Sequence, residues 1–423
     1  MKKVLKVIAI IIITVIILSV IGFNYKTVLA SHKIKDVVEA GTTVEEFTIP
    51  SDVEIVGVGE ATHGNKEFQE IKLEIFKKLV KDNGFTAFAI EADYGDCLAA
   101  NEYIQGGEGD AREIVNNMMF TLYHTDEMAD TLEWMRDYNM AVNENQKLRF
   151  YGFDMQNPDV TVPYLLDYLK KNNIDVETSE LEKLTDYEAV AKGENVKKEL
   201  ADIRTELNKK SKEYLDYDLE SALHMTTTIS QYMDYEKPDQ IEMLDYRDKC
   251  MAENVTWILD LEKQIGGGKV MLGAHDGHIG KISQLGYQKT SMGGELKEKY
   301  GDKYYSLGTD FFKTTDNIAV TREDENSESQ RKNYSLTSAD PLAYQAKYFD
   351  DKRYCLDFTT LSETEQKSVY DMVHSDVTMG SIGEGFADVY CLMHWAYRID
   401  KVPADLYDGM VFYYKTNPIE PEN

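Results

Sequence analysis

Cysteine and proline are scarce in this sequence, and their scarcity excludes two classes of protein. The 423 residues include 4 cysteines, 8 prolines and 27 glycines. A disulfide-stabilised scaffold or a collagen-like chain needs far more of these residues. The four cysteines lie far apart in the sequence and form no C-x-x-C pair. This spacing indicates buried free thiols and provides no basis for a cysteine-dependent site.

Positive charge is also deficient. The chain has 46 Lys and Arg against 75 Asp and Glu, which gives a formal net charge of −29. Proteins that bind nucleic acid present a basic surface, and no run of Lys or Arg lies beside aromatic residues here. The composition therefore argues against nucleic acid as a partner. The 43% share of hydrophobic residues is ample for a sizeable core.

One long hydrophobic run is present, at the N-terminus. Three lysines precede an apolar stretch from Val7 to Phe23, which at about 1.5 Å per residue nearly spans a hydrocarbon core of about 30 Å. A cleaved signal peptide has a shorter apolar region, of about 7–15 residues, although a plausible cleavage site ends at Ala30. We expect residues 1–30 to be a single-pass membrane anchor, or a signal segment if they are cleaved. The remainder, 31–423, would then lie outside the cytoplasm, membrane-bound or secreted.

Short apolar runs alternate with amphipathic helical segments over the rest of the chain. The candidate strands are Glu54–Gly59, Thr86–Ile90, Leu148–Phe153, Lys269–Gly273, Tyr304–Gly308 and Met410–Tyr414. This alternation predicts an α/β fold with a central parallel or mixed sheet flanked by helices. Residues from about 163 to 261 contain no convincing strand and are rich in charge. We expect them to form a helical, largely solvated insertion within the domain.

Acidic and histidine side chains stand at the ends of four of these strands. They are Glu60, His63, Glu91, Asp154, His275 and His278. In open α/β sheets, ligands bind outside the carboxyl ends of the strands. Segments far apart in the sequence would therefore deliver these groups to one site.

The spacing of Glu60 and His63 fits a general base. A carboxylate that holds one imidazole nitrogen fixes the tautomer and raises the basicity of the ring. The sequence has no G-x-S-x-G motif and no suitably flanked Ser or Cys, so we expect activation of water in preference to a covalent acyl intermediate. His124, in a Tyr-His-Thr turn, is a further candidate whose role stays open.

Two other functions remain open at this point. His275 and His278, with His63 and two glutamates, are acceptable Zn²⁺ ligands, which would indicate a metal-dependent enzyme acting on envelope polysaccharide. Their spacing is not H-E-x-x-H, and we expect no metal or other cofactor. A non-catalytic surface-binding protein that uses the acidic insertion is the second alternative. It would have no use for a base paired with an orienting carboxylate.

These motifs together resemble those of the erythromycin esterase family, also known in bacteria as succinoglycan biosynthesis proteins. The segments that carry the likeness are Gly59-Glu60-Ala61-Thr62-His63-Gly64, Trp134-Met135-Arg136-Asp137-Tyr138-Asn139, Tyr151-Gly152-Phe153-Asp154, Arg247-Asp248, Gly273-Ala274-His275-Asp276-Gly277-His278 and Tyr407-Asp408-Gly409-Met410. They keep their order from about residue 45 to the C-terminus. The resemblance implies metal-free hydrolysis of a small-molecule ester such as a macrolide lactone. His63 would activate water with help from Glu60, while Glu91, His275 and His278 would complete the polar site.

The sequence also departs from the pattern of that family. Lys72 stands nine residues after His63, where similar members have an arginine, and lysine lacks the planar fork of arginine. We expect Lys72, Asp154 and His124 to contact the substrate. The usual His-Asn-x-His carries Asp276 here, which adds a negative charge. Because an enzyme that protects ribosomes is expected in the cytosol, export weakens the macrolide assignment and leaves a cell-surface acyl ester as the alternative.

Overall fold

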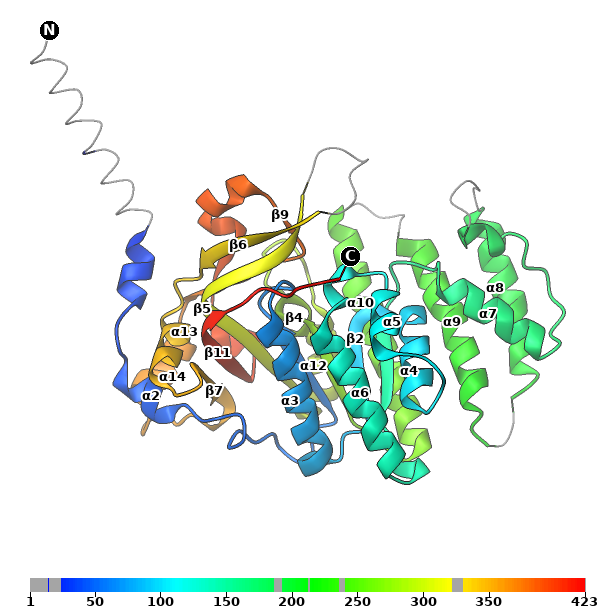
Figure 1. Cartoon of the computed structure of the whole chain (residues 1–423), viewed down its shortest axis with the longest axis horizontal. Coiled ribbons are helices and arrows are strands. Elements are labelled where there is room, and N and C mark those ends of the chain that lie inside the picture. The colour runs from blue at the N-terminus through cyan, green and yellow to red at the C-terminus, as the bar shows by residue number, and fades with distance from the viewer. Residues whose placement is uncertain are drawn as a thin grey trace, which may run out of the picture.

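A nine-stranded mixed sheet runs through the computed structural model, which describes residues 24–185, 192–211, 214–235, 240–321 and 330–422 together with Thr14 (Figure 1). Neighbouring strands lie parallel in the order β3, β2, β4, β1, β5 and β11, and β7 pairs antiparallel with β11. The long β5 also pairs with β6 and β9 beyond this path. The bounds are β1 Ile55–Glu60, β2 Ala87–Asp93, β3 Arg149–Asp154, β4 Val270–His275, β5 Tyr304–Val320, β6 Arg331–Thr337, β7 Arg353–Asp357, β9 Gly385–Phe386 and β11 Gly409–Thr416. A separate pair is formed by β8 Val377–Gly380 and β10 Arg398–Lys401.

Alternation along the strands builds a hydrophobic core on each face of the sheet. In β2, Ala87 and Ala89 face one core while Phe88 and Ile90 face the other, as the two-residue period of a strand requires. Helices α3, α4, α5 and α6 pack on the Phe88 face, and α7, α8, α9, α10 and α12 pack on the Ala87 face. The predicted α/β fold with a mixed, helix-covered sheet is therefore confirmed.

The helices follow the expected spacing of apolar residues. In α3, Phe68, Ile71, Ile75 and Leu79 are buried at intervals of three and four, which is the period of a one-sided helix. The helix ends at Gly84, whose φ of 71° lies in the left-handed region that glycine tolerates. The bounds are α2 Lys35–Ala40, α3 Lys66–Asn83, α4 Leu98–Ile104, α5 Ala111–Asn116, α6 Asp126–Ala141, α7 Thr161–Lys171, α8 Gly193–Asn208, α9 Tyr217–Tyr235, α10 Gln240–Ile265, α11 Asp276–Ile279, α12 Met292–Tyr300, α13 Pro341–Gln345, α14 Lys367–Val373 and α15 Pro403–Leu406.

The segment expected as an insertion, residues 163–261, holds α8, α9 and most of α7 and α10, with no strand among its described residues. Figure 1 shows α7, α8 and α9 gathered at one end of the molecule. Leu165, Met225 and Val255 of this segment are buried in the core that covers the Ala87 face of the sheet. Helix α10 thereby brings its N-terminal half to the carboxyl ends of the strands.

The predicted membrane anchor lies largely outside the described residues, because nothing between 15 and 23 is described. Within the described ranges, no helix combines the length and the hydropathy that a membrane crossing needs. Residues 24–30, the first continuous described stretch up to Ala30, form a helix.

Candidate active site

The turn after β1 holds a buried pair formed by Glu60 and His63. Glu60 Oε1 lies 2.6 Å from Nδ1 of His63, and Glu60 Oε2 accepts a 2.5 Å ion-paired hydrogen bond from Nζ of Lys72. The side chains of Glu60 and Lys72 are 3% and 6% exposed, whereas that of His63 is 12% exposed. Nε2 of His63 has no hydrogen-bond partner among the described residues.

This arrangement fixes the charges of the pair. Burial alone raises the pKa of Glu60, but the charge of Lys72 and the hydrogen bond to His63 outweigh it and lower that pKa to about 2. Burial lowers the pKa of His63, and the hydrogen bond and charge of Glu60 raise it above its ordinary value. The imidazole therefore becomes more basic through its carboxylate partner, as a general base requires.

Glu91, at the carboxyl end of β2, connects three separate segments. Its Oε1 accepts a 2.8 Å hydrogen bond from Nη2 of Arg247, and its Oε2 accepts a 2.8 Å hydrogen bond from the backbone N–H of His275. The hydroxyl of Tyr123 donates to the backbone carbonyl of Glu91 at 3.0 Å. Burial raises the pKa of this carboxyl, but His278 and Arg247 hold it well below its usual range.

His275, at the end of β4, is a neutral imidazole with a defined tautomer. Its Nδ1 accepts from the N–H of Gly277 at 3.1 Å, so the proton is on Nε2, which lies 3.2 Å from the carbonyl oxygen of Ile382. Burial, together with the neighbouring His63 and His278, lowers the pKa of His275 to about 3. This ring is therefore a hydrogen-bond donor at neutral pH.

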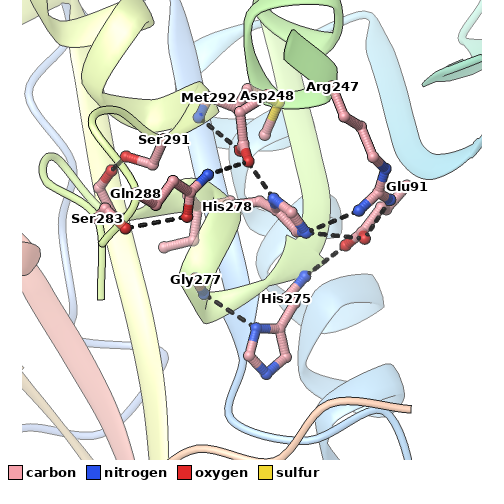
Figure 2. A network of polar contacts seen from close by, with 12 residues as sticks. Glu91, Arg247, Asp248, His275, Gly277, His278, Ser283, Gln288, Ser291 and Met292 are labelled. Atoms are coloured by element: carbon pink, nitrogen blue, oxygen red, sulfur yellow. Dashed lines mark hydrogen bonds and ion pairs between the residues drawn. The ribbon is translucent and has the colours of Figure 1, made fainter. Parts of the chain in front are cut away.

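Helix α11 carries His278, which lies between two carboxylates (Figure 2). Nδ1 is 2.8 Å from Asp248 Oδ1, and Nε2 is 3.2 Å from Glu91 Oε1. Burial lowers the pKa of His278, but Asp248 and Glu91 outweigh it and raise that pKa to about 10. The ring is therefore a cation that donates to both carboxylates. Nη1 of Arg247 lies 3.2 Å from Nε2, but it does not donate to Nε2 because that nitrogen carries a proton.

The predicted catalytic residues at and just after the ends of β1, β2 and β4 do come together. The rings of His63 and His275 lie 5.0 Å apart between centroids, and those of His275 and His278 lie 6.4 Å apart. Glu60 contacts His63 directly, and Glu91 contacts both His275 and His278. The roles of these five residues in a reaction remain predictions.

Of the three predicted substrate contacts, Lys72 and Asp154 are bonded to this network and His124 is not. Lys72 is buried against Glu60, and Asp154 is fully buried against Arg247, whose Nη2 donates to it at 2.6 Å. Nε2 of His124 lies 2.8 Å from the carbonyl oxygen of Met118, and among the described residues no hydrogen bond joins the His124 ring to the histidine cluster. Contact of these three side chains with a substrate stays a prediction.

Sequence reasoning missed Arg247 and Asp248 of α10 as site residues. Arg247 is held by Asp154 and Glu91, while Asp248 accepts from His278, from Gln288 Nε2 at 2.6 Å and from the N–H of Met292 at 2.8 Å (Figure 2). The available signal was a charged pair of opposite sign, Arg247-Asp248, within one of the motifs noted above.

Asp276, which the sequence predicts to add a negative charge, is buried beside β1. Its Oδ1 accepts from the backbone N–H of Thr309 at 3.2 Å and packs against Gly59. Burial raises the pKa of Asp276 well above its usual value. Within the described residues, no group of three or more His, Cys, Asp or Glu side chains is arranged to hold a metal ion.

The fold and the site together define an α/β protein with a histidine–carboxylate centre at the carboxyl ends of parallel strands. The chain belongs to the erythromycin esterase family, because the family model described as Erythromycin esterase matches residues 80–416. The match includes Glu91, Arg247 and the two later histidines, whereas Glu60 and His63 precede it. Membership of this family supports a hydrolase.

Two curated relatives share this similarity at a distance. The chain is 27% identical over 301 residues to erythromycin esterase type II of Escherichia coli. This match covers 62% of this chain and 69% of that protein. It is 22% identical over 291 residues to the putative hydrolase YbfO of Bacillus subtilis (strain 168). This second match covers 60% of this chain and 64% of that protein.

Solved structures show the same fold. A succinoglycan biosynthesis protein superposes with a TM-score of 0.71 at 22% identity, covering 92% of this chain and 97% of that one. A mutant of the erythromycin esterase EreC in its open conformation superposes with a TM-score of 0.57 at 15% identity, covering 87% and 92%. At these identities the likeness concerns the fold alone.

Proposed function

We propose that this protein hydrolyses a carboxylic ester by His63-assisted attack of water. The observation that carries the proposal is the environment of His63, whose Nδ1 is held by Glu60 while Nε2 has no partner among the described residues and the ring is partly exposed. This is the geometry of an imidazole that is oriented by a carboxylate and presents its second nitrogen to a reactant.

The proposed step is an addition followed by an elimination. Nε2 of His63 takes a proton from water while the water oxygen bonds to the acyl carbon of the ester. The bond between the acyl carbon and the alcohol oxygen then breaks, and the protonated imidazole returns its proton to the departing alkoxide. The products are a carboxylic acid and an alcohol, so the reaction needs no group other than water.

The substrate class is a small-molecule ester, either a macrolide lactone or a cell-surface acyl ester. Similarity to an erythromycin esterase supports the first, and similarity in fold to a succinoglycan biosynthesis protein is compatible with the second. Mass spectrometry of macrolides and acyl sugars incubated with the protein would identify the product that has gained one water molecule.

Substitution of His63 tests the proposal. We expect His63→Ala to lower kcat by about 10²–10⁴, the usual contribution of a general base, with an unchanged circular-dichroism spectrum. His374→Ala is a matched control, because that ring is exposed and its one hydrogen bond among the described residues is to the nearby Tyr370 carbonyl. An ester-hydrolysis rate that His63→Ala leaves unchanged would refute the assignment.

We also propose that residues 1–30 are retained as a membrane anchor, with the catalytic domain outside the cytoplasm. Contacts made by residues that precede the possible cleavage site support retention, since Lys26 bonds to Asp400 and Thr378, Arg398 bonds to Thr27, and Ala30 is 5% exposed. Fractionation of cells that express the full chain, with N-terminal sequencing, would find an intact chain in the membrane. A secreted chain that begins at Ser31 would contradict this.

A further inference from the structure

The helix over residues 24–30 is attached to the body of the protein along one side. Nζ of Lys26 lies 2.8 Å from Asp400 and 2.9 Å from Thr378, and Nη2 of Arg398 donates to Thr27 at 3.3 Å. Thr378 belongs to β8, and Arg398 and Asp400 belong to β10. Ala30, at the end of the helix, is buried in the hydrophobic core. The segment that follows the N-terminal apolar run is therefore fixed to the β8–β10 pair and does not act as a free linker.

Exposed apolar side chains concentrate at this helix and at one neighbouring segment. Of the thirteen large apolar side chains that are exposed among the described residues, six lie in residues 25–29 and 389–395. They are Tyr25 at 52%, Val28 at 70%, Leu29 at 65%, Val389 at 49%, Leu392 at 73% and Trp395 at 75%. We name this set the apolar rim. Soluble surfaces seldom leave such side chains clustered, so a concentration of this kind marks an interaction surface.

The two parts of the apolar rim are close in space. The charge of Lys26 is near enough to His394 to lower the pKa of that ring, after the larger effect of burial and that of Arg398. Arg398, which bonds to Thr27, lies three residues after Trp395, the last residue of the 389–395 segment. Figure 1 shows both parts on the left of the molecule, on the side away from α7, α8 and α9.

The sequence indicates what covers the apolar rim. The apolar run Val7–Phe23 ends where the attached helix begins, so a bilayer that contains this run would lie next to the part of the rim formed by residues 25–29. Tryptophan and leucine are side chains that favour the membrane interface. A net charge of −29 argues against close approach by an acidic partner or a second copy of the chain.

We propose that the apolar rim lies against the lipid bilayer that holds the N-terminal apolar run. The proposal rests on the membrane anchor proposed above and is independent of the ester chemistry. It has a consequence for the site, because Ile382, whose carbonyl accepts from His275, and Glu384, which is paired with Arg331, immediately precede the rim segment. The partly exposed ring of His63 would thus stand at a fixed height above the membrane surface.

Spin labels on the full chain test this proposal. The chain is reconstituted in phosphatidylcholine vesicles with a nitroxide at Leu392→Cys, in a background with Cys391→Ser. The other three cysteines are buried and need no change. A second variant carries the label at Val28→Cys. The matched control is Met140→Cys, on α6 and 55% exposed.

The measured quantity is the ratio of nitroxide collisions with oxygen, which concentrates in lipid, to collisions with a water-soluble nickel complex. We expect this ratio to be several-fold higher at positions 392 and 28 than at position 140. Equal collision ratios at positions 392 and 140 would overturn the proposal. Protection of position 392 from both reagents would overturn it as well, because it would indicate that protein covers this position. Failure of the chain to float with the vesicles would overturn it too. Ester hydrolysis measured on the same samples is a separate readout, so loss of activity would count against the proposed function and not against membrane contact.

Discussion

At the scale of single residues, the site depends on a carboxylate shared by a lysine and a histidine. Glu60 is 2% exposed and is bonded to both Lys72 and His63. Burial of a carboxylate is costly unless it is paired, and here the pairing also orients the imidazole. A lysine at position 72 satisfies this need with a single charge, whereas an arginine would add a planar fork.

Position 59 requires glycine because Asp276 and Ile279 pack closely against it. A Cβ added there would lie 1.8 Å from Oδ1 of Asp276, so the buried carboxyl would have to move. We expect Gly59→Ala to lower the free energy of unfolding by about 1–3 kcal/mol, the usual cost of overpacking. Chemical denaturation measures this. Gly286→Ala is the control, since nothing lies within 4 Å of its added Cβ, and equal stability of the two variants would contradict the account.

At the scale of elements, the strand ends are what the sequence predicts best. Each of β1, β2, β3 and β4 begins within one residue of its predicted start, because short apolar runs bounded by polar turns are a strong strand signal. Parallel pairing then places Glu60, Glu91 and His275 at one edge without further information. The site histidines and glutamates are predictable for this reason.

Helix positions are harder to predict from the sequence. The contacts of Arg247 and Asp248 depend on how α10, 26 residues long, rotates and slides over the sheet, and no local pattern fixes this. Their segment was expected to be largely solvated. The ion pair that joins Lys72 of α3 to Glu60 was likewise not predicted. Tertiary packing decides such contacts.

Arg247 is the contribution of α10 that most affects the stability of the site. Its guanidinium is 12% exposed and binds Glu91 and Asp154. Removing it leaves buried Asp154 without a cation among the described residues and leaves Glu91 paired with His278 alone. We expect Arg247→Met to lower the free energy of unfolding by about 3–5 kcal/mol. Arg353→Met, which loses a more exposed pair with Glu74, should cost about 0–1 kcal/mol. Equal costs in a denaturant titration would argue against the buried network.

At the scale of the whole molecule, buried carboxyls of two kinds set the pH dependence of stability. The pKa of Glu60 is lowered to about 2 and that of Glu91 is also lowered. Their contribution is therefore present above the unfolded value of about 4.3 and is lost as the pH falls below it. Asp316 behaves in the opposite way, because burial raises its pKa to about 7.

Asp316 provides a direct test of this opposite behaviour. The folded protein retains the proton up to about pH 7, whereas the unfolded chain releases it near pH 3.9, so this group lowers stability as the pH rises between these values. We expect Asp316→Asn to raise Tm at pH 8 and to change it little at pH 4.5. Asp302→Asn, at a fully exposed position, should change Tm little at either pH. A larger gain for Asp316→Asn at pH 4.5 than at pH 8 would contradict the prediction.

The pH dependence of kcat/KM in two variants tests most directly whether His63, held by Glu60, is the general base. Glu60 raises the pKa of His63, and Lys72 offsets part of the charge of Glu60 through their ion pair. The account predicts that Glu60→Gln moves the acid limb of the profile to lower pH and that Lys72→Met moves it to higher pH, each relative to the wild type. An acid limb that stays at the same pH in both variants, or moves in the same direction in both, would contradict it.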